Sequence, residues 1–412
     1  MAYLKTFKSG LRLVVEKIEG LYSVTMGIMV GAGSVNETEK NNGISHFIEH
    51  TTFKGTKKRT SFQVSDDAEF IGAKINAFTS KDVTAYYIKS TTDKVEDAFE
   101  ILSDIFVNAT YDETEMEREK GVICEEISMV DDTPDEICLD LLSEAFFGKT
   151  GYGKTILGSK ENVNSFTKQD VLNYRNACYT AENTVVVFAG NVDEQLAEKI
   201  TEKYIEGALV EKGKILSEKS NILFGSLSAK KDIEQAHIAL AYKGLKFEDE
   251  RKDLLTLSST ILGGGMSSRL FQKIREELGL CYTVFAYPSY YKDTGSLVIY
   301  AGVNPSSAKG AVQAILEVVE NFGSQGVTEK EFLRAKNQML SSLVMSQENT
   351  ASLMTAHAKY LIETGKLYDY NKTIKNIEKI TYQQVNSFIK EFDFSKFASA
   401  IVSNGITEEI FK

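Results

Sequence analysis

The segment His46-Phe-Ile-Glu-His50 carries three side chains that can hold and use a metal ion. Residues four apart share one face of a helix, so the two imidazoles can bind the same ion. Glu49 lies on the same side and can reach a water at the metal without being a ligand. Two histidine ligands, an open position and a carboxylate base are the parts of a hydrolytic zinc site. The alternative interpretation is an amphipathic helix whose histidines face the solvent.

A catalytic zinc ion normally has three protein ligands, so one more residue must complete the site. The acidic segment 113–130 offers six glutamates: Glu113, Glu115, Glu117, Glu119, Glu125 and Glu126. Glu119 and Glu126 stand almost two helical turns apart and therefore share a face if the segment is a helix. Spacing alone leaves the choice among the glutamates open, and a solvated acidic face is the alternative.

The longer stretch Gly43-Ile-Ser-His-Phe-Ile-Glu-His-Thr-Thr-Phe-Lys-Gly-Thr56 resembles the active-site segment of the pitrilysin/insulinase metallopeptidases. The most similar branch is the mitochondrial and bacterial processing peptidases. In this family the third zinc ligand is a glutamate 76 positions after the second histidine, which implies Glu126. A further active-site glutamate seven positions earlier implies Glu119. The resemblance thus implies one Zn²⁺ per chain, held by the two histidines and Glu126, with Glu49 as the general base.

A second similar segment covers residues 267–282 and contains Arg275 and Tyr282. In the family, this pair helps to bind the substrate and the transition state, and Tyr282 would stabilise the oxyanion. The pair lies in the second half of the chain, whereas the zinc residues lie in the first half. The longest family members hold four half-size domains in one chain, and this chain has two. The resemblance therefore implies a homodimer that forms a closed chamber, in which each site borrows Arg275 and Tyr282 from the partner.

Asn76, Ala77 and Phe78 match the edge strand that pairs with the peptide backbone in the family. The resemblance implies that this strand binds the substrate through main-chain hydrogen bonds, with loose side-chain specificity. Two positions depart from the family pattern, because Thr155 and Ala181 stand where proline is usual. This departure changes two turns and no chemistry.

The elements that must position these residues occur in the same order in both halves of the chain. Alternating apolar residues predict strands at 11–15, 23–30, 73–78, 83–89, 184–189, 235–243, 281–290, 295–302 and 398–402. Helical periodicity predicts helices at 43–54, 61–72, 92–107, 113–131, 135–147, 167–177, 194–206, 250–263, 268–278, 306–323, 329–347, 350–364 and 381–391.

This pattern predicts an α+β fold with two homologous, duplicated α/β-sandwich domains, each a mixed, mostly antiparallel sheet covered by helices. We expect an N-terminal zinc-binding catalytic domain over 1–210 and a C-terminal homologous domain over 233–412 that carries the Arg275/Tyr282 segment. Residues 211–232 change character and are expected to form a linker with an edge strand.

Composition excludes several classes of function. The 412-residue chain has 58 acidic and 47 basic side chains and a net charge of −11, which argues against nucleic acid and is compatible with basic peptides. The four cysteines form no close pair, so we expect reduced structural thiols and a cytoplasmic location. The N-terminus has no apolar signal core, and no segment reaches the length of an apolar membrane span.

Taken together, the residues and the resemblance predict a zinc metalloendopeptidase that hydrolyses peptides or unfolded, presequence-like segments. The alternative is a non-catalytic structural or partner subunit of a processing-peptidase-like complex. Such subunits typically lack a zinc ligand or the base, and this sequence retains all of them. A zinc hydrolase of small molecules is a third class, which the substrate-strand segment disfavours.

Overall fold

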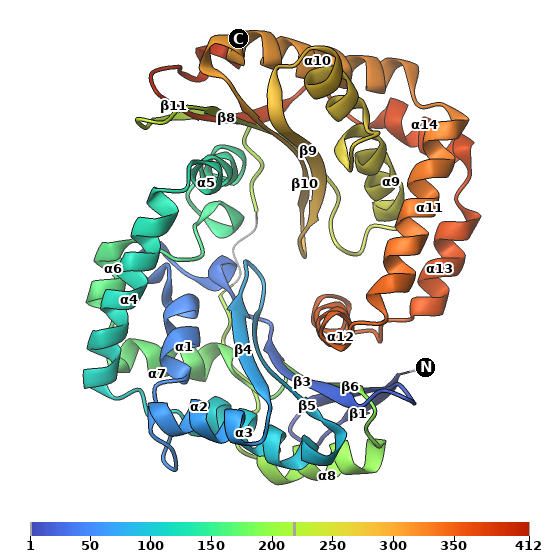
Figure 1. Ribbon diagram of the computed structural model, residues 1–412. Helices are drawn as coiled ribbons and strands as arrows, with labels where there is room; N and C mark the ends of the chain where they lie inside the picture. The colour runs from blue at the N-terminus through green and yellow to red at the C-terminus, as the bar shows by residue number, and fades with distance from the viewer. Residues whose placement is uncertain (1, 217–219, 412) are drawn as a thin grey trace. The chain divides into compact units, whose positions relative to one another are not determined.

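The computed structural model describes residues 2–216 and 220–411. The chain forms two compact units, each built from three stretches of sequence. Unit 1 contains Met1–Ile127, Thr155–Glu218 and Val344–Tyr370. Unit 2 contains Ser128–Lys154, Lys219–Leu343 and Asn371–Lys412. Each unit has one sheet and several helices (Figure 1), which confirms the predicted α+β fold with two homologous domains.

The sheet of unit 1 has six strands in the order β1-β2-β6-β3-β5-β4. The strands are β1 (Tyr3–Thr6), β2 (Arg12–Lys17), β3 (Ser23–Val30), β4 (Lys74–Thr79), β5 (Thr84–Thr91) and β6 (Thr184–Gly190). β2 and β6 are parallel, and the other neighbours are antiparallel. All seven residues of β6 are buried, because apolar clusters cover both faces of the sheet at this strand. β4 forms one edge of the sheet.

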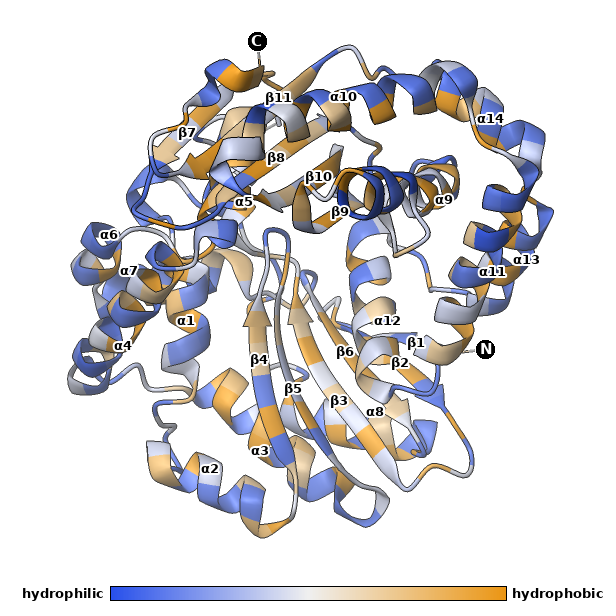
Figure 2. Ribbon diagram, turned by 45° about the horizontal axis from the view of Figure 1, so that its top comes forward, coloured by the Kyte–Doolittle hydropathy of each residue, from blue (hydrophilic) through white to orange (hydrophobic). Residues whose placement is uncertain are grey.

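One face of this sheet packs against helices from the first half of the chain. They are α1 (Ile44–Thr52), α2 (Ser61–Phe70), α3 (Val95–Asn108), α4 (Glu113–Asp131), α6 (Lys160–Ser165), α7 (Lys168–Cys178) and α8 (Glu194–Tyr204). These helices combine apolar and polar residues (Figure 2), and the apolar ones form a common core with the sheet. The other face packs against α12 (Thr350–Thr364), which comes from the second half of the chain and contacts β2, β3 and β6.

The sheet of unit 2 has five strands in the order β7-β11-β8-β10-β9. The strands are β7 (Ser226–Lys230), β8 (Ala236–Lys243), β9 (Cys281–Tyr290), β10 (Gly295–Val303) and β11 (Phe397–Ser403). β7 and β11 are parallel, and the other neighbours are antiparallel. The helices are α5 (Pro134–Phe147), α9 (Lys252–Gly263), a π-helix (Phe271–Glu277), α10 (Ala308–Gln325), α11 (Glu329–Ser346), α13 (Tyr370–Lys379) and α14 (Tyr382–Glu391). Among the described residues, no helix has both the length and the apolar character needed to cross a bilayer.

Two helices exchange between the halves of the chain, so the units differ from the contiguous domains predicted over 1–210 and 233–412. Helix α5 packs on β7, β8 and β11 of unit 2, and α12 packs on the sheet of unit 1. Each exchange buries apolar side chains: Met354 and Leu361 of α12 are 1% exposed and cluster with Met29 of β3. The sequence shows that these helices are amphipathic, but it does not show which sheet each one covers.

Most predicted elements are present within a few residues of their expected ends. The predicted linker contains the expected edge strand, β7, and its residues 217–219 lie outside the described part of the chain. Strand β1 and helices α6 and α13 were not predicted, because short or strongly polar segments show little apolar periodicity. The helix predicted over 268–278 is a π-helix at Phe271–Glu277.

Candidate metal centre

The predicted metal-binding motif lies on helix α1, which is nine residues long. Its apolar face is fully buried through Phe47 and Ile48. The helix begins after Gly43, whose φ of +99° favours glycine. A Cβ at Gly43 would lie 2.5 Å from the carbonyl oxygen of Leu157, so only glycine lets the helix start this close to the neighbouring loop. The apolar face and this glycine together fix where α1 starts and which way it faces.

The structure brings the three predicted ligands together. Oε2 of Glu126 lies 3.6 Å from Nε2 of His46 and 3.4 Å from Nε2 of His50. One ligand atom from each residue can be chosen so that all lie within 4.8 Å of one another. A tetrahedral zinc ion with bonds of about 2.0–2.2 Å separates its ligand atoms by roughly 3.4 Å. Two imidazole nitrogens and one carboxylate oxygen at these separations therefore fit Zn²⁺.

The protonation of His46 also suits a ligand. Burial and the neighbouring His50 lower the pKa of His46 to about 3, so its ring is neutral at neutral pH. The His46 side chain is nearly inaccessible, and its buried Nδ1 has no hydrogen-bond partner in the structure. The two histidine rings meet edge to face, with centroids 4.5 Å apart. A neutral imidazole presents a lone pair to a metal ion.

Glu119 contacts a ligand rather than joining the ligand group. Its Oε1 lies 2.9 Å from Nδ1 of His50, and its Oε2 forms an ion pair with Nζ of Lys54 at 2.7 Å. Burial opposes ionisation of Glu119, but these two hydrogen bonds prevail and lower its pKa. A hydrogen bond to Nδ1 fixes the orientation of the His50 ring and leaves Nε2 free to bind a metal. The sequence motifs did not identify Lys54 as part of this arrangement.

Glu49 is held at the end of strand β4. The hydroxyl of Thr79 donates a hydrogen bond to Oε2 of Glu49. Burial raises the pKa of Glu49, against the opposing effect of this hydrogen bond. Thr79 was not predicted as a site residue, because its contact with Glu49 joins positions 30 residues apart and no local spacing reports it.

The predicted substrate residues Asn76, Ala77 and Phe78 all lie on β4. β4 pairs with β5 on one side only and ends the strand order of the sheet. Asn76 is exposed, and its Oδ1 accepts a hydrogen bond from the backbone N–H of Ala77 at 2.8 Å. β4 is thus an edge strand that ends beside Glu49, since Thr79 is its last residue.

Arg275 and Tyr282 belong to unit 2. Arg275 lies in the π-helix, with its guanidinium 4.7 Å from the ring centre of Phe271 and 4.9 Å from that of Tyr282. Tyr282 is the second residue of strand β9 and is 75% exposed. The two residues are therefore in contact with each other, and the Tyr282 hydroxyl is accessible to solvent.

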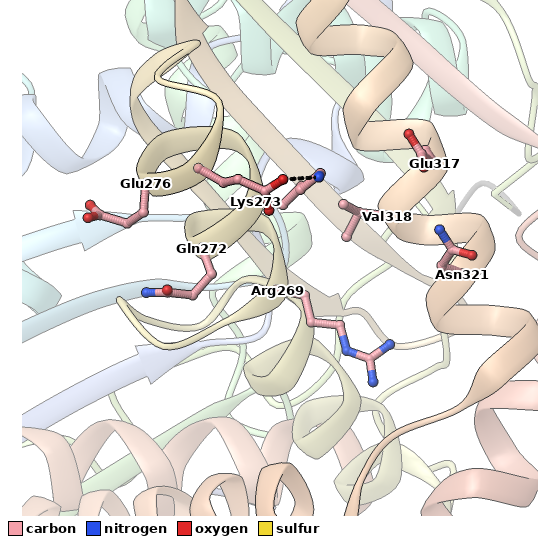
Figure 3. Close-up of a pocket in the computed structure, with 8 residues that line it drawn as sticks. Arg269, Gln272, Lys273, Glu276, Glu317, Val318 and Asn321 are labelled. Carbon is pink, nitrogen blue, oxygen red and sulfur yellow. Dashed lines mark hydrogen bonds and ion pairs between the residues drawn. The ribbon is translucent and has the colours of Figure 1, made fainter.

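The same π-helix lines a pocket of about 610 Å³ together with α10 (Figure 3). The two cationic side chains that line this pocket, Arg269 and Lys273, each pair with a carboxylate of this chain. Arg269 binds Glu331 through two hydrogen bonds of 2.8 and 2.9 Å, and Lys273 pairs with Glu277. The pocket therefore contains no cation without a carboxylate partner.

The remaining histidines, His237 and His357, do not belong to the group of candidate ligands His46, His50 and Glu126. Nδ1 of His237 lies 2.7 Å from the hydroxyl of Tyr300, and Nε2 of the buried His357 lies 3.1 Å from a carboxylate oxygen of Glu16. Within the described residues, no second group of histidine, cysteine and carboxylate side chains could hold a metal ion. All four cysteines are free thiols, as predicted.

Comparison with protein families gives two matches that together cover most of the chain. The model described as "Insulinase (Peptidase family M16)" matches residues 12–160. The model described as "Peptidase M16 inactive domain" matches residues 165–339. The first match contains the candidate ligands His46, His50 and Glu126, and the second contains Arg275 and Tyr282.

Curated relatives match over nearly their full length. An uncharacterized zinc protease of Bacillus subtilis, YmxG, is 37% identical over 399 residues, which cover 97% of each chain. An uncharacterized zinc protease of Streptomyces coelicolor is 32% identical over 94% of this chain and 86% of its own length. Another from Mycobacterium tuberculosis strain H37Rv is 30% identical over 96% of this chain and 92% of its own length.

Two solved structures share the fold. A protease from Helicobacter pylori superposes with a TM-score of 0.91 at 21% identity and covers 98% of this chain and 99% of its own. A protein from Pseudomonas fluorescens, described as a peptidase M16 inactive domain, superposes with a TM-score of 0.92 at 18% identity, covering 99% and 98%. At these identities the likeness concerns the fold alone.

Proposed function

The chain belongs to the insulinase family of peptidases, family M16, and from this premise we propose that it is a zinc metalloendopeptidase. Its substrates are peptides or unfolded, presequence-like segments. The observation that carries the proposal is the convergence of His46, His50 and Glu126, with the half-buried carboxylate of Glu49 on the same helix as the two histidines. Relatives named zinc proteases support the same chemistry.

In this proposal His46, His50 and Glu126 hold one Zn²⁺. When bound, the ion would supply a Lewis acid for the scissile carbonyl and lower the pKa of water. Glu49 accepts a proton from the attacking water and delivers it to the leaving amine. Its burial raises its pKa, which suits a carboxylate that must hold a proton between two steps. The hydrogen bond from Thr79 keeps one carboxylate oxygen in place while the other exchanges the proton.

Strand β4 supports a peptide substrate. An extended peptide can add to the open edge of a sheet, and backbone hydrogen bonds then provide affinity with little dependence on side chains. Because β4 ends at Thr79 beside Glu49, a peptide paired with Asn76–Phe78 would run toward the carboxylate that moves the proton. The net charge of −11 favours basic peptides.

We further propose that the active form is a homodimer in which Arg275 and Tyr282 of one copy act on the substrate held by the other. An exposed phenol beside a guanidinium can donate a hydrogen bond to a developing oxyanion. Mixing an Arg275→Ala chain with a Glu49→Gln chain is expected to restore part of the activity that each lacks. Absence of rescue under conditions in which subunits exchange would argue against the shared site.

A non-catalytic partner subunit is the alternative function. The match to a family model named as an inactive domain concerns residues 165–339, which exclude the metal-binding group. The part of the chain that carries the group matches the insulinase model. The complete set of ligands and base therefore favours the enzyme.

The decisive experiment measures zinc content and peptide cleavage on the same preparation. We expect one zinc per chain, cleavage of a quenched basic peptide, and loss of cleavage with a chelator that is reversed by added zinc. Stoichiometric zinc without cleavage of any peptide in a diverse library would favour the non-catalytic alternative. Cleavage that survives complete removal of zinc would refute the proposed mechanism.

A further inference from the structure

A carboxylate that no motif identified lies at the start of the metal-binding helix. Glu37 is 1% exposed, and both of its oxygens accept hydrogen bonds from residues at the N-terminus of α1. Oε1 accepts from the backbone N–H of Ser45 at 2.9 Å, and Oε2 accepts from the backbone N–H of Gly43 at 2.8 Å. The amide of Asn42 donates to Oε2 at 2.8 Å. Glu37 therefore receives hydrogen bonds from Asn42, Gly43 and Ser45, which lie within four consecutive positions.

These contacts replace a local helix cap. The first N–H groups of a helix have no partner within the helix, and a side-chain oxygen at the N-cap position usually accepts from one of them. The N-cap of α1 is Gly43, which has no side chain and must remain glycine because of its close approach to Leu157. Glu37 supplies the missing acceptor from six residues upstream, and its negative charge also suits the positive end of the helix dipole.

Burying a carboxylate costs free energy unless hydrogen bonds compensate for the lost water. Burial raises the pKa of Glu37, and the hydrogen bonds from Asn42, Ser45 and Gly43 oppose that rise. The carboxylate is thus held beside the start of α1, since its donors Asn42, Gly43 and Ser45 all lie at or just before the first turn of this helix.

The first turn of α1 sets the position of the histidines. His46 is the third residue of the helix and directly follows Ser45, whose N–H is held by Glu37 and whose hydroxyl lies 2.8 Å from that of Tyr174. His50 follows one turn later. In a helix of nine residues, a small rotation or fraying of the first turn moves both imidazoles relative to Glu126.

We propose that Glu37 is a positioning residue for the metal centre: it fixes the start of α1 and thereby the convergence of His46 and His50 on Glu126. It touches neither the ligands nor the ion, and acts through the backbone of Gly43 and Ser45. The inference rests on the proposed function insofar as the group that it positions is a zinc site.

Asp104 provides a matched control in the same unit. It is 2% exposed and also receives three hydrogen bonds, from Thr56, Arg59 and Asn108, at 2.7, 2.9 and 2.9 Å. None of these donors lies on α1. In Glu37→Gln, one of the two backbone N–H groups faces an NH₂ group instead of an acceptor, and Asp104→Asn makes the equivalent change away from the metal centre.

The experiment compares full-length wild type, Glu37→Gln and Asp104→Asn by three measurements. They are the zinc dissociation constant from competition with a chromophoric chelator, the thermal midpoint of the metal-free chain, and amide hydrogen exchange over residues 43–52 of the metal-free chain. Glu37→Gln is expected to weaken zinc binding about tenfold, the smallest effect that is typical of residues that orient metal ligands without binding the ion. It is also expected to accelerate amide exchange in α1. Asp104→Asn is expected to lower the thermal midpoint while its zinc dissociation constant stays within about twofold of wild type.

A zinc dissociation constant of Glu37→Gln within twofold of wild type overturns the proposal, as does equal weakening by Asp104→Asn. If wild type binds no zinc, the proposed function fails, and exchange in the metal-free chain still decides the role of Glu37: unchanged protection of residues 43–52 in Glu37→Gln refutes it. If Glu37→Gln does not fold, Glu37→Asp replaces it. Its shorter side chain keeps the charge but cannot reach both Gly43 and Ser45, so the same weakening is expected.

Discussion

The two units share one scaffold and differ in what their helices carry. The order β2-β6-β3-β5-β4 in unit 1 corresponds to β7-β11-β8-β10-β9 in unit 2, with the parallel pair at the same place in both. In each unit an α-helix follows the strand that comes second along the chain in this set, as α1 follows β3 and α9 follows β8. α1 presents two histidines and a glutamate, whereas α9 has neither residue type and buries Leu255, Leu257 and Ile261.

Helix α4, which carries Glu119 and the candidate ligand Glu126, shows the same contrast. When α11 is aligned with α4 at their Glu-x-Glu starts, Ala335 stands at the position of Glu119 and Ser342 at that of Glu126. Both sheets keep an open edge, at β4 and at β9, so the scaffold for binding an extended chain is common to the units. The comparison indicates that the two units share a fold, and that a few side chains give only unit 1 the candidate metal ligands.

The largest effect is expected from the proposed base. Glu49→Gln should reduce kcat for peptide cleavage by roughly 10³-fold, within the range for a general acid–base, because the amide cannot accept the proton. Zinc content should remain at the wild-type level, since Glu49 is outside the ligand group. Steady-state kinetics and metal analysis check both, with Glu125→Gln as a control on an exposed face of α4. Turnover near wild type in zinc-loaded Glu49→Gln would remove Glu49 from the mechanism.

Glu126→Ser gives unit 1 the residue that unit 2 has at this position. Loss of a ligand should weaken zinc binding by more than about 100-fold, beyond the effect of removing an outer partner. Chelator competition measures the change, and cleavage should fall with zinc occupancy. If the dissociation constant changed less than tenfold, a different third ligand would have to be sought.

Glu119→Ala makes the corresponding change to the outer partner. It removes the hydrogen bond to Nδ1 of His50 and the ion pair with Lys54, and should weaken zinc binding about 10- to 100-fold. Glu117→Ala, two residues earlier on the same helix, is the control, because the exposed Glu117 pairs with Lys120 rather than with a candidate zinc ligand. Equal effects of the two substitutions would contradict the specific role of Glu119.

Lowering the pH should remove the contribution of the Arg269–Glu331 ion pair to the stability of unit 2. The ion pair with Arg269 and the hydrogen bonds from Thr328 overcome partial burial and lower the pKa of Glu331 to about 2, from an ordinary value of 4.5. A lowered folded-state pKa stabilises the fold above pH 4.5, and this contribution is lost as the pH falls from 4.5 through 2. Glu331→Gln should cost about 1–2 kcal/mol at pH 7, because partial exposure screens the pair, and much less near pH 2. Urea unfolding at both pH values tests this; a pH-independent cost would contradict the ionic origin.

The part of the site that the sequence predicted is the part encoded by short spacing. His46, Glu49 and His50 lie within one turn, so helical geometry alone places them together. Resemblance selected Glu126 among six glutamates, a choice that spacing left open. Thr79, Lys54 and Glu37 were missed, because each acts through tertiary contacts with residues whose distance along the chain carries no signal.

The same distinction applies to the fold. Periodicity predicted nearly every strand and helix, since each element records its own buried face. The exchange of α5 and α12 was not predicted. The apolar face of an amphipathic helix shows that the helix packs against something, but it does not identify the sheet. For α5 and α12 that sheet lies mostly in the other half of the sequence.

That exchange has a consequence for synthesis on the ribosome. The sheet of unit 1 is complete once β6 has emerged, but the face that buries Met29, Val185 and Val187 stays open until α12, which begins at Thr350, is available. In unit 2 the order is reversed. Helix α5, which begins at Pro134, is synthesised long before its partner strand β11 at Phe397–Ser403. The second face of the unit 1 sheet and the core of unit 2 therefore stay incomplete while the chain is half made, although the first core of unit 1 uses only residues of the first half. We expect nascent chains of intermediate length to expose apolar surface of the kind that chaperones bind.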